Sequence, residues 1–173
     1  MSSISHTRTD QFLSVIRKSA SPNERGFALE ELLCDLFKKI PGLSITKRNE
    51  DKKFEDRDIE IIFWNEQKSD GFYFLPNIIP IGAHRWLEKI EKEHIKWFLR
   101  RLKERGLSFG ILIATNGLAE DEEERSLLRQ QISLALNDER QILILKGKDF
   151  EKISSAEQLV TLVKEKLCEL AVA

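Results

Sequence analysis

Residues 56–86 decide how this chain folds. Two apolar segments, DRDIEIIFW (56–64) and NIIPIGAHRW (77–86), flank the polar segment NEQKSDG (65–71). Isoleucine and aromatic residues favour strands, whereas polar and glycine-containing segments favour turns. We therefore predict a strand at 58–64, a turn at 65–71 and a further strand at 72–83. Pro76 and Pro80 interrupt the second strand, and because proline lacks an N–H group they should lie at a bulge or on an unpaired side.

Hydrophobic periodicity and end signals place the other elements. We predict strands at 43–48, 108–115 and 141–145. Helices are predicted at 12–20, at 23–40 with Asn23 as its cap, at 86–105, and from 155 onward. A further helix is predicted to open with the acidic residues 120–124. This order predicts an α/β fold, in which an antiparallel meander followed by parallel crossovers forms a mixed central sheet flanked by helices. We treat 1–21 as an N-terminal helix and connection to one domain at 22–173.

Composition narrows the classes of partner and compartment. The chain carries 28 Lys and Arg against 29 Asp and Glu, so any contact with nucleic acid has to come from a local basic patch. Cys34 and Cys168 lie in helix-like apolar patterns without metal-type spacing, and we expect buried, reduced thiols. Residues 1–8 have no apolar h-region, so we expect no secretory signal, and no apolar run reaches the ~20 residues that span a bilayer. We expect a cytoplasmic protein without membrane contact.

Common cofactor and hydrolase signatures are missing from the sequence. It has no Gly-rich phosphate loop, no Cys/His zinc spacing and no nucleophile elbow, and its three histidines are scattered. Carboxylate chemistry on the mixed sheet remains. Asp58 and Glu60 share a strand face because strand side chains alternate, although Asp58 could be a strand-start residue and Glu60 could point at water. The literal E-x-K at 66–68 lies in the polar turn, and we interpret it as a solvated loop.

The helix at 23–40 carries a second candidate carboxylate. Rotation of about 100° per residue separates Glu30 from its neighbour Glu31. Glu30 shares a row with Leu33 and Phe37 and borders the buried face, whereas Glu31 is expected to point into solvent. Helix geometry therefore favours Glu30 over Glu31 as a site residue.

Several segments together resemble Mrr-type restriction endonucleases of the PD-(D/E)xK nuclease superfamily. RGFALE (25–30) with the apolar residues that follow is similar to the family's first helix, and RDIEI (57–61) to its first catalytic strand. FGILIATNG (109–117) resembles the strand after the crossover helix, and QILIL (141–145) with Asp149 and Phe150 the closing strand and turn. The resemblance covers roughly 22–170 and implies a restriction-endonuclease-like fold.

The resemblance also implies a chemistry. In the family, a strand aspartate and a carboxylate on the next strand hold Mg²⁺ for phosphodiester hydrolysis, and a lysine two residues later orients the attacking water. Asp58 matches the aspartate and Glu30 the supplementary helix glutamate, but Gly82 stands at the carboxylate position and His84 at the lysine position. The candidate metal ligands are therefore Asp58, Glu30 and Glu60 as a relocated carboxylate. The candidate catalytic residues are Asp58, Glu30 and His84, which can exchange a proton near neutral pH.

Basic residues suggest where DNA, the expected partner, would bind. Lys47, Arg48, Arg100 and Arg101 are the candidate phosphate contacts, although cations also favour helix C-termini and solvated loops. Three functions stay open: a DNA-cutting domain of a restriction or defence system, a catalytically inactive nuclease-fold module for DNA binding or partner assembly, and a protein-interaction domain. The sequence leaves both a homodimer and a partner subunit open.

Overall fold

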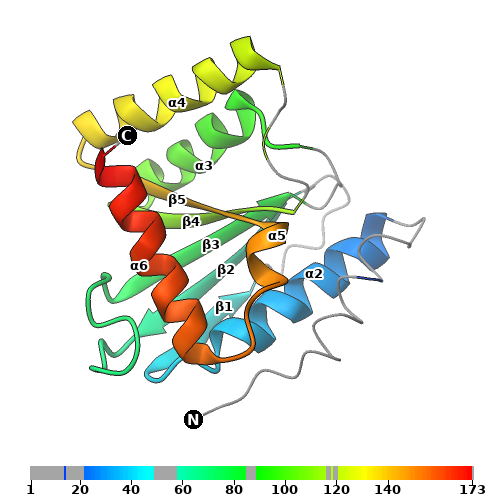
Figure 1. Cartoon of the computed structure of the whole chain (residues 1–173), viewed down its shortest axis with the longest axis vertical. Coiled ribbons are helices and arrows are strands. Elements are labelled where there is room, and N and C mark those ends of the chain that lie inside the picture. Colours follow the sequence, from blue (N-terminus) through cyan, green and yellow to red (C-terminus); the bar gives the residue numbers. More distant parts are fainter. Residues whose placement is uncertain are drawn as a thin grey trace.

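The sheet of this protein contains both antiparallel and parallel pairs. The computed structural model describes residue 14 and residues 22–48, 58–84, 89–115, 118 and 121–172; at 22–25, 48, 58 and 84 it describes the backbone only. A five-stranded sheet has the order β1 (Leu43–Arg48), β2 (Asp58–Asn65), β3 (Ile78–His84), β4 (Phe109–Ala114) and β5 (Gln141–Lys146). The first three strands pair antiparallel and the last three parallel (Figure 1). The predicted mixed α/β sheet is confirmed.

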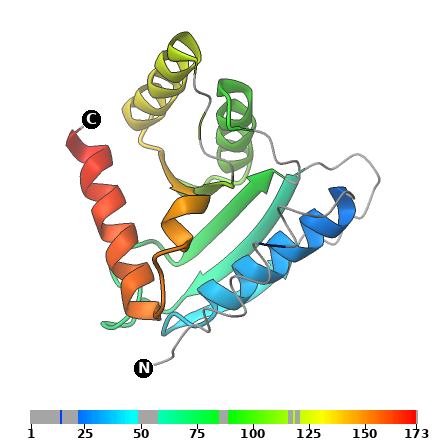
Figure 2. The same cartoon turned by 45° about the vertical axis from the view of Figure 1, so that its right-hand side comes forward.

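Helices cover both faces of this sheet. They are α2 (Pro22–Phe37), α3 (Lys92–Glu104), α4 (Glu122–Asn137), the short α5 (Gly147–Phe150) and α6 (Ala156–Val172). Of the helix predicted at 12–20, only Ser14 lies within the described residues, and it is helical. Figure 2 shows α3 and α4 side by side, away from α2, which runs along the sheet. None of the helices in the described ranges is long and apolar enough to cross a membrane.

Strand alternation sends side chains into two separate cores. Ile59, Ile61 and Phe63 of β2 join a large core with residues of α2 and α6. On the opposite face, Leu112 and Ile142 join a smaller core with residues of α3 and α4. Because side chains alternate with period two, Glu60 and Gly82 belong to the face that α3 covers.

The third strand is shorter than predicted, because a buried asparagine holds the preceding segment in turns. Asn65 is fully buried, and its Nδ2 donates to the carbonyl oxygens of Phe72 at 2.8 Å and Pro76 at 3.1 Å. These bonds fold 71–75 into turns, so β3 starts at Ile78 instead of 72. Pro80 precedes the three-residue parallel pairing of β3 with β4, which begins at Ile81, as expected for a residue without an N–H group.

Helix ends also differ from the predicted ones. Pro22 is already helical, so Asn23 is not the cap of α2, and α2 ends at Phe37 instead of residue 40. Helix α3 begins only at Lys92, because the backbone N–H of Glu91 donates to Nδ1 of His94 at 3.0 Å and closes a capping box. The prediction that acidic residues open this helix is confirmed for residues 121–124 at the start of α4.

The two cysteines differ in their environment. Cys34 on α2 is buried, as predicted, whereas Cys168 on α6 is exposed. The prediction for Cys168 was wrong because its helix lies on the outside of the domain, and its apolar stripe reaches the core mainly through Leu159, Val160 and Val163.

Candidate functional site

Four predicted site positions face one another across two strands. In the antiparallel pairing of β2 with β3, Asp58 lies opposite His84, and Glu60 lies opposite Gly82. Directly opposed residues project from the same face of a sheet, so the register places these four positions on one face. The side chains of Asp58 and His84 lie outside the described part of the structure, which leaves their roles as predictions.

Gly82 provides space for an aromatic ring. A Cβ built at this position would lie 2.8 Å from Cε2 of Phe98, a fully buried residue of α3. A Cβ built at Gly110 of β4 would likewise lie 2.8 Å from Cε1 of this ring. The two glycines therefore leave room for the Phe98 ring on the sheet, and a carboxylate side chain at position 82 would collide with this ring. Two features of the sequence indicated this contact: Phe98 falls on the apolar side of its helix, and both glycines lie within strands.

Glu60 is a buried acid with a cationic partner. Only 9% of its side chain is exposed, and its Oε1 forms an ion pair with Nη1 of Arg105, the residue that follows α3. Burying a carboxylate without a partner is strongly unfavourable, so Arg105 compensates the charge. The alternative that Glu60 points at water is wrong, because α3 covers this part of the sheet. The sequence placed Arg105 in a basic cluster at the end of the helix but did not predict its pairing with Glu60, which is 45 residues away.

Glu30 lies on the other side of the sheet. Its helix packs Leu29, Leu32 and Leu33 into the core that contains Ile59 and Ile61. Glu60 projects from the opposite face, so the described residues do not bring Glu30 and Glu60 together. Glu30 is half-buried, as a residue bordering the core should be. Glu31 is also half-buried, so the prediction that it points into solvent was wrong.

The described residues do not fit a metal site of the kind that the resemblance implies. Such a site needs free carboxylates on two adjacent strands. Gly82 has no side chain and no room for one, and the Glu60 carboxylate is already paired with Arg105. Glu66 is no substitute, because the 66–68 segment is exposed beyond the end of β2 and Glu66 Oε1 accepts from Nε1 of Trp64 at 2.9 Å. Within the described ranges, no group of three or more His, Cys, Asp or Glu could hold a metal ion.

The predicted DNA contacts fall on different surfaces. Lys47 is exposed on β1 and pairs in register with Ile62, on the sheet face of Glu60. The Arg48 backbone lies opposite Ile61, and its side chain is outside the description. Arg101 lies over the Trp97 ring, with Cζ 5.8 Å from the ring centroid. Its neighbour Arg100 is instead at the edge of a groove between α3 and α4.

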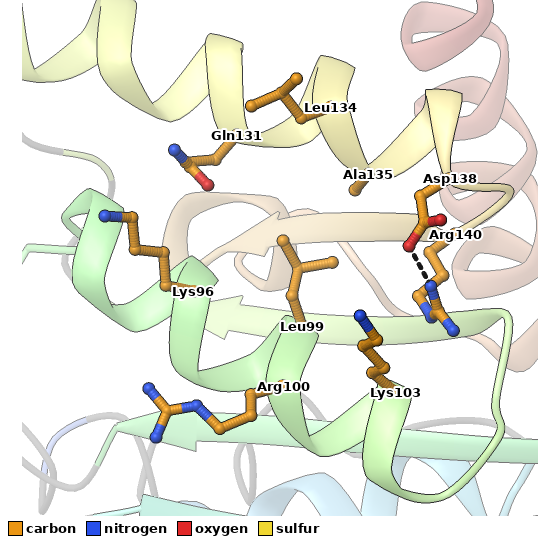
Figure 3. A pocket seen from close by; sticks show the side chains of 9 residues that line it. All are labelled: Lys96, Leu99, Arg100, Lys103, Gln131, Leu134, Ala135, Asp138 and Arg140. Carbon is orange, nitrogen blue, oxygen red and sulfur yellow. Dashed lines mark hydrogen bonds and ion pairs between the residues drawn. The ribbon is translucent and has the colours of Figure 1, made fainter.

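This groove is a hollow between described residues. It has a volume of about 330 Å³ and is lined by both helices and by the residue before β5. Figure 3 shows Leu99 projecting from α3 toward α4, with Lys96 and Lys103 on either side of it. The lining residues are Lys96, Leu99, Arg100, Lys103, Gln131, Leu134, Ala135, Asp138 and Arg140.

Comparison with known families agrees with this architecture. The family model Mrr_cat, described as restriction endonuclease, matches residues 23–145, which run from the start of α2 into β5. No curated protein matches the chain significantly. The matched segment contains all the strand positions discussed above, so the domain is nuclease-like. The chain belongs to the Mrr restriction endonuclease family.

Proposed function

We propose that this domain is a DNA-binding module of a cytoplasmic restriction or defence system, in which the family's cleavage site is degenerate. One observation carries the proposal: the Phe98 ring occupies the space in which a carboxylate at position 82 would project. The glycine at position 82 is therefore part of the core packing, because Phe98 is fully buried against β3 and β4. Restoring the acid would require repacking α3.

The ion pair beneath α3 supports the same conclusion. Glu60 lies directly across the ladder from position 82, and Arg105 neutralises it. Breaking a buried pair leaves an uncompensated charge, so a metal ion would have to replace the guanidinium. The pair connects the C-terminal end of α3 to β2.

We infer the DNA-binding surface from two cationic residues on one face. Trp97, Arg101 and Arg105 recur every four residues and so lie on one side of α3. Arg105 reaches Glu60 on β2, so this side of the helix faces β2. Lys47 lies on the same sheet face, where Trp64 is also partly exposed. Phosphate binding by Lys47 and Arg101, with Arg48 next to Lys47 in sequence, would give an affinity that falls as salt rises.

A second candidate function is Mg²⁺-dependent cleavage, and the strand register favours it. Glu60 lies one strand away from the missing carboxylate, and Asp58 precedes it by two residues on the same face. In this alternative, Asp58 and Glu60 would hold Mg²⁺ in place of the Glu60–Arg105 pair, and His84 would exchange the proton. Glu30, the supplementary glutamate that the resemblance implies, lies on the other face of the sheet and would not reach them. Mg²⁺ would supply a Lewis acid and an activated water.

Plasmid cleavage and DNA binding separate the two functions. Supercoiled plasmid is incubated with Mg²⁺ or Mn²⁺ and wild-type protein, Asp58→Ala or the control Asp70→Ala, which alters an exposed turn. Binding to a labelled duplex is measured across a salt series. We expect salt-dependent binding in all three proteins and no nicking. Nicking that disappears only in Asp58→Ala would establish the second candidate, and absence of DNA binding would leave the protein-interaction function.

A further inference from the structure

The sheet face that carries α3 and α4 is only partly covered. The two helices contact β4 and β5 on this face (Figure 1). On its antiparallel side, Trp64 of β2 is 37% exposed and Ile78 of β3 is 40% exposed. These two residues lie directly opposite each other in the ladder, so their side chains project from the same face as neighbours. They therefore form one apolar patch on the sheet, and not two isolated exposed residues.

The Trp64 ring is held in one orientation at this surface. Its Nε1 donates a hydrogen bond to Oε1 of Glu66 at 2.9 Å. The next residue, Asn65, is fully buried and bonds to the turn that follows, which fixes the end of the strand. A side chain that is already ordered loses little conformational entropy when a ligand covers it. Trp64 therefore presents a pre-oriented aromatic surface.

A β-bulge in β1 adds a cation to the same face. Ile45 pairs with Phe63, and Lys47 pairs with the adjacent residue Ile62, so β1 contains one extra residue here. Regular alternation would place Lys47 on the face of Ile45, which packs against the large core. The bulge places it on the opposite face, which is the face of Trp64. The exposed lysine and the exposed tryptophan thus share one surface.

Five side chains on this surface form two rows across three strands. Strands lie about 4.8 Å apart and alternate residues about 7 Å apart, so the Cα atoms span roughly 10 by 7 Å. Ser44 and Lys47 are exposed on the β1 side, and Ile62 is half-buried. We call the five residues the Trp64 strip: Ser44, Trp64 and Ile78 in the outer row, and Lys47 and Ile62 in the inner row.

We propose that the Trp64 strip binds single-stranded DNA. One base stacks on the Trp64 ring and against Ile78, and Lys47 contacts a phosphate of the same strand. The inference rests on the DNA-binding function proposed above and specifies the form of DNA that this part of the surface takes. Because every base has a π-face, stacking should show little sequence preference.

The size and shape of the strip favour a single strand over other ligands. A standard protein interface buries roughly 800 Å² on each partner, far more than the strip offers. A duplex keeps its base faces stacked inside and presents only base edges and phosphates, so it cannot stack a base on Trp64. A single strand has unstacked bases that aromatic side chains can cover.

The charges around the strip also suit a phosphate backbone. The acid beside it, Glu66, accepts the hydrogen bond from the Trp64 ring. A lysine lies next to this acid, because a Cβ built at Gly42 would meet Cγ of Lys68 at 2.9 Å and Cβ of Glu66 at 3.2 Å. Lys47 and Lys68 therefore outnumber Glu66 along the edge of the strip. A phosphate next to a stacked base would find a cation on either side.

Fluorescence anisotropy on the whole chain tests this inference with labelled probes. They are a short oligo-dT, an oligonucleotide of the same length in which every position is abasic, and a duplex. The two single strands carry the same phosphates, so a difference in affinity reports contacts to the bases. We expect wild type to bind oligo-dT about tenfold more tightly than the abasic strand, as stacking of one base predicts.

Substitutions assign that difference to Trp64. Trp64→Ala should bind both single strands alike, whereas Trp64→Phe keeps a ring and should retain part of the difference. Tyr73→Ala is the matched control, because Tyr73 is also an exposed aromatic residue but lies against Lys164 of α6, a helix of the opposite face. It should keep the full difference. Circular dichroism checks that every variant is folded.

The probes separate failure of this inference from failure of the proposed function. Equal affinity of wild type for oligo-dT and the abasic strand, with the duplex still bound, would overturn this inference alone. Loss of binding to every DNA probe would overturn the proposed function as well. A difference that survives in Trp64→Ala would overturn the role of the strip. Tighter, Trp64-dependent binding of an oligo-U RNA than of oligo-dT would overturn the assignment to DNA.

Discussion

Gly82 of β3 and Phe98 of α3 are in direct contact, and a Cβ at position 82 would approach Cε2 of the ring to 2.8 Å. This contact connects the packing of α3 on the sheet with the candidate site on β2 and β3. Position 82, to which the resemblance assigns the family's second carboxylate, is part of the core between α3 and the sheet. The absence of a carboxylate at position 82 and the burial of the Phe98 ring are therefore two aspects of one packing arrangement.

The Gly82–Phe98 contact predicts a coupled stability effect. Gly82→Ala should lower the free energy of unfolding by about 1–3 kcal/mol, because the fully buried Phe98 ring cannot move aside freely. In a Phe98→Leu background the same substitution should cost less, since the smaller side chain leaves room for Cβ. Urea unfolding of the four proteins in a double-mutant cycle measures the difference. Equal costs in both backgrounds would show that the ring does not limit the position.

The Glu60–Arg105 ion pair predicts an asymmetry between single and double substitutions. Arg105→Ala should destabilise the protein by about 1–3 kcal/mol, because it leaves a buried carboxylate without its cation. Glu60→Gln in the Arg105→Ala background should recover part of the loss by removing the orphaned charge. Chemical denaturation of the single and double variants measures this, with Arg129→Ala as an exposed arginine control. No recovery in the double variant would argue against the pair.

The proposed DNA surface predicts a change in salt dependence. Each phosphate contact contributes about one unit to the slope of log K against log salt. Lys47→Ala and Arg101→Ala should each reduce that slope by about one and weaken binding similarly for different DNA sequences. Fluorescence anisotropy with two unrelated duplexes measures both effects. Lys152→Ala, an exposed lysine in the turn before α6, is the control and should leave the slope unchanged.

The two cysteines should react at different rates. Cys168 is exposed on α6, so a thiol reagent should modify it in the native protein. Cys34 is buried in the α2 core and should react only after unfolding. Titration with a chromogenic disulfide before and after adding denaturant counts the thiols, and Cys168→Ser should remove the fast phase. A fast phase that survives in this variant would contradict the assignment.

The buried Asn65 should matter more than its neighbours in the turn. Its Nδ2 donates to the carbonyls of Phe72, Leu75 and Pro76, and its Oδ1 accepts from the Gln67 N–H. Asn65→Ala leaves several buried groups unpaired and should destabilise the fold by about 2–3 kcal/mol. Asn77→Ala removes one half-buried bond and should cost less. Thermal unfolding compares the two variants, and equal losses would contradict the central role of Asn65.

The sequence by itself determined the elements and their order. Alternating apolar residues, apolar stripes and turn residues are local patterns, and they placed all five strands within a few residues except for the start of β3. That start was predicted too early because Asn65 folds 71–75 into turns through side-chain bonds to the backbone, which no periodicity reveals. The start of α3 was also predicted too early, because the capping box of Glu91 and His94 depends on side-chain bonds to the backbone.

Only the tertiary structure decided what the site residues contact. Alternation placed Asp58 and Glu60 on one face, but their register with His84 and Gly82 comes from the structure. The structure likewise decided that Glu60 pairs with Arg105, which follows α3, and that Gly82 contacts Phe98 of α3. Glu30 looked equivalent to the strand acids in sequence, yet α2 packs on the opposite face of the sheet. The physical reason is that local patterns fix which side of an element is apolar, whereas the crossing of α3 over the sheet decides which atoms meet there.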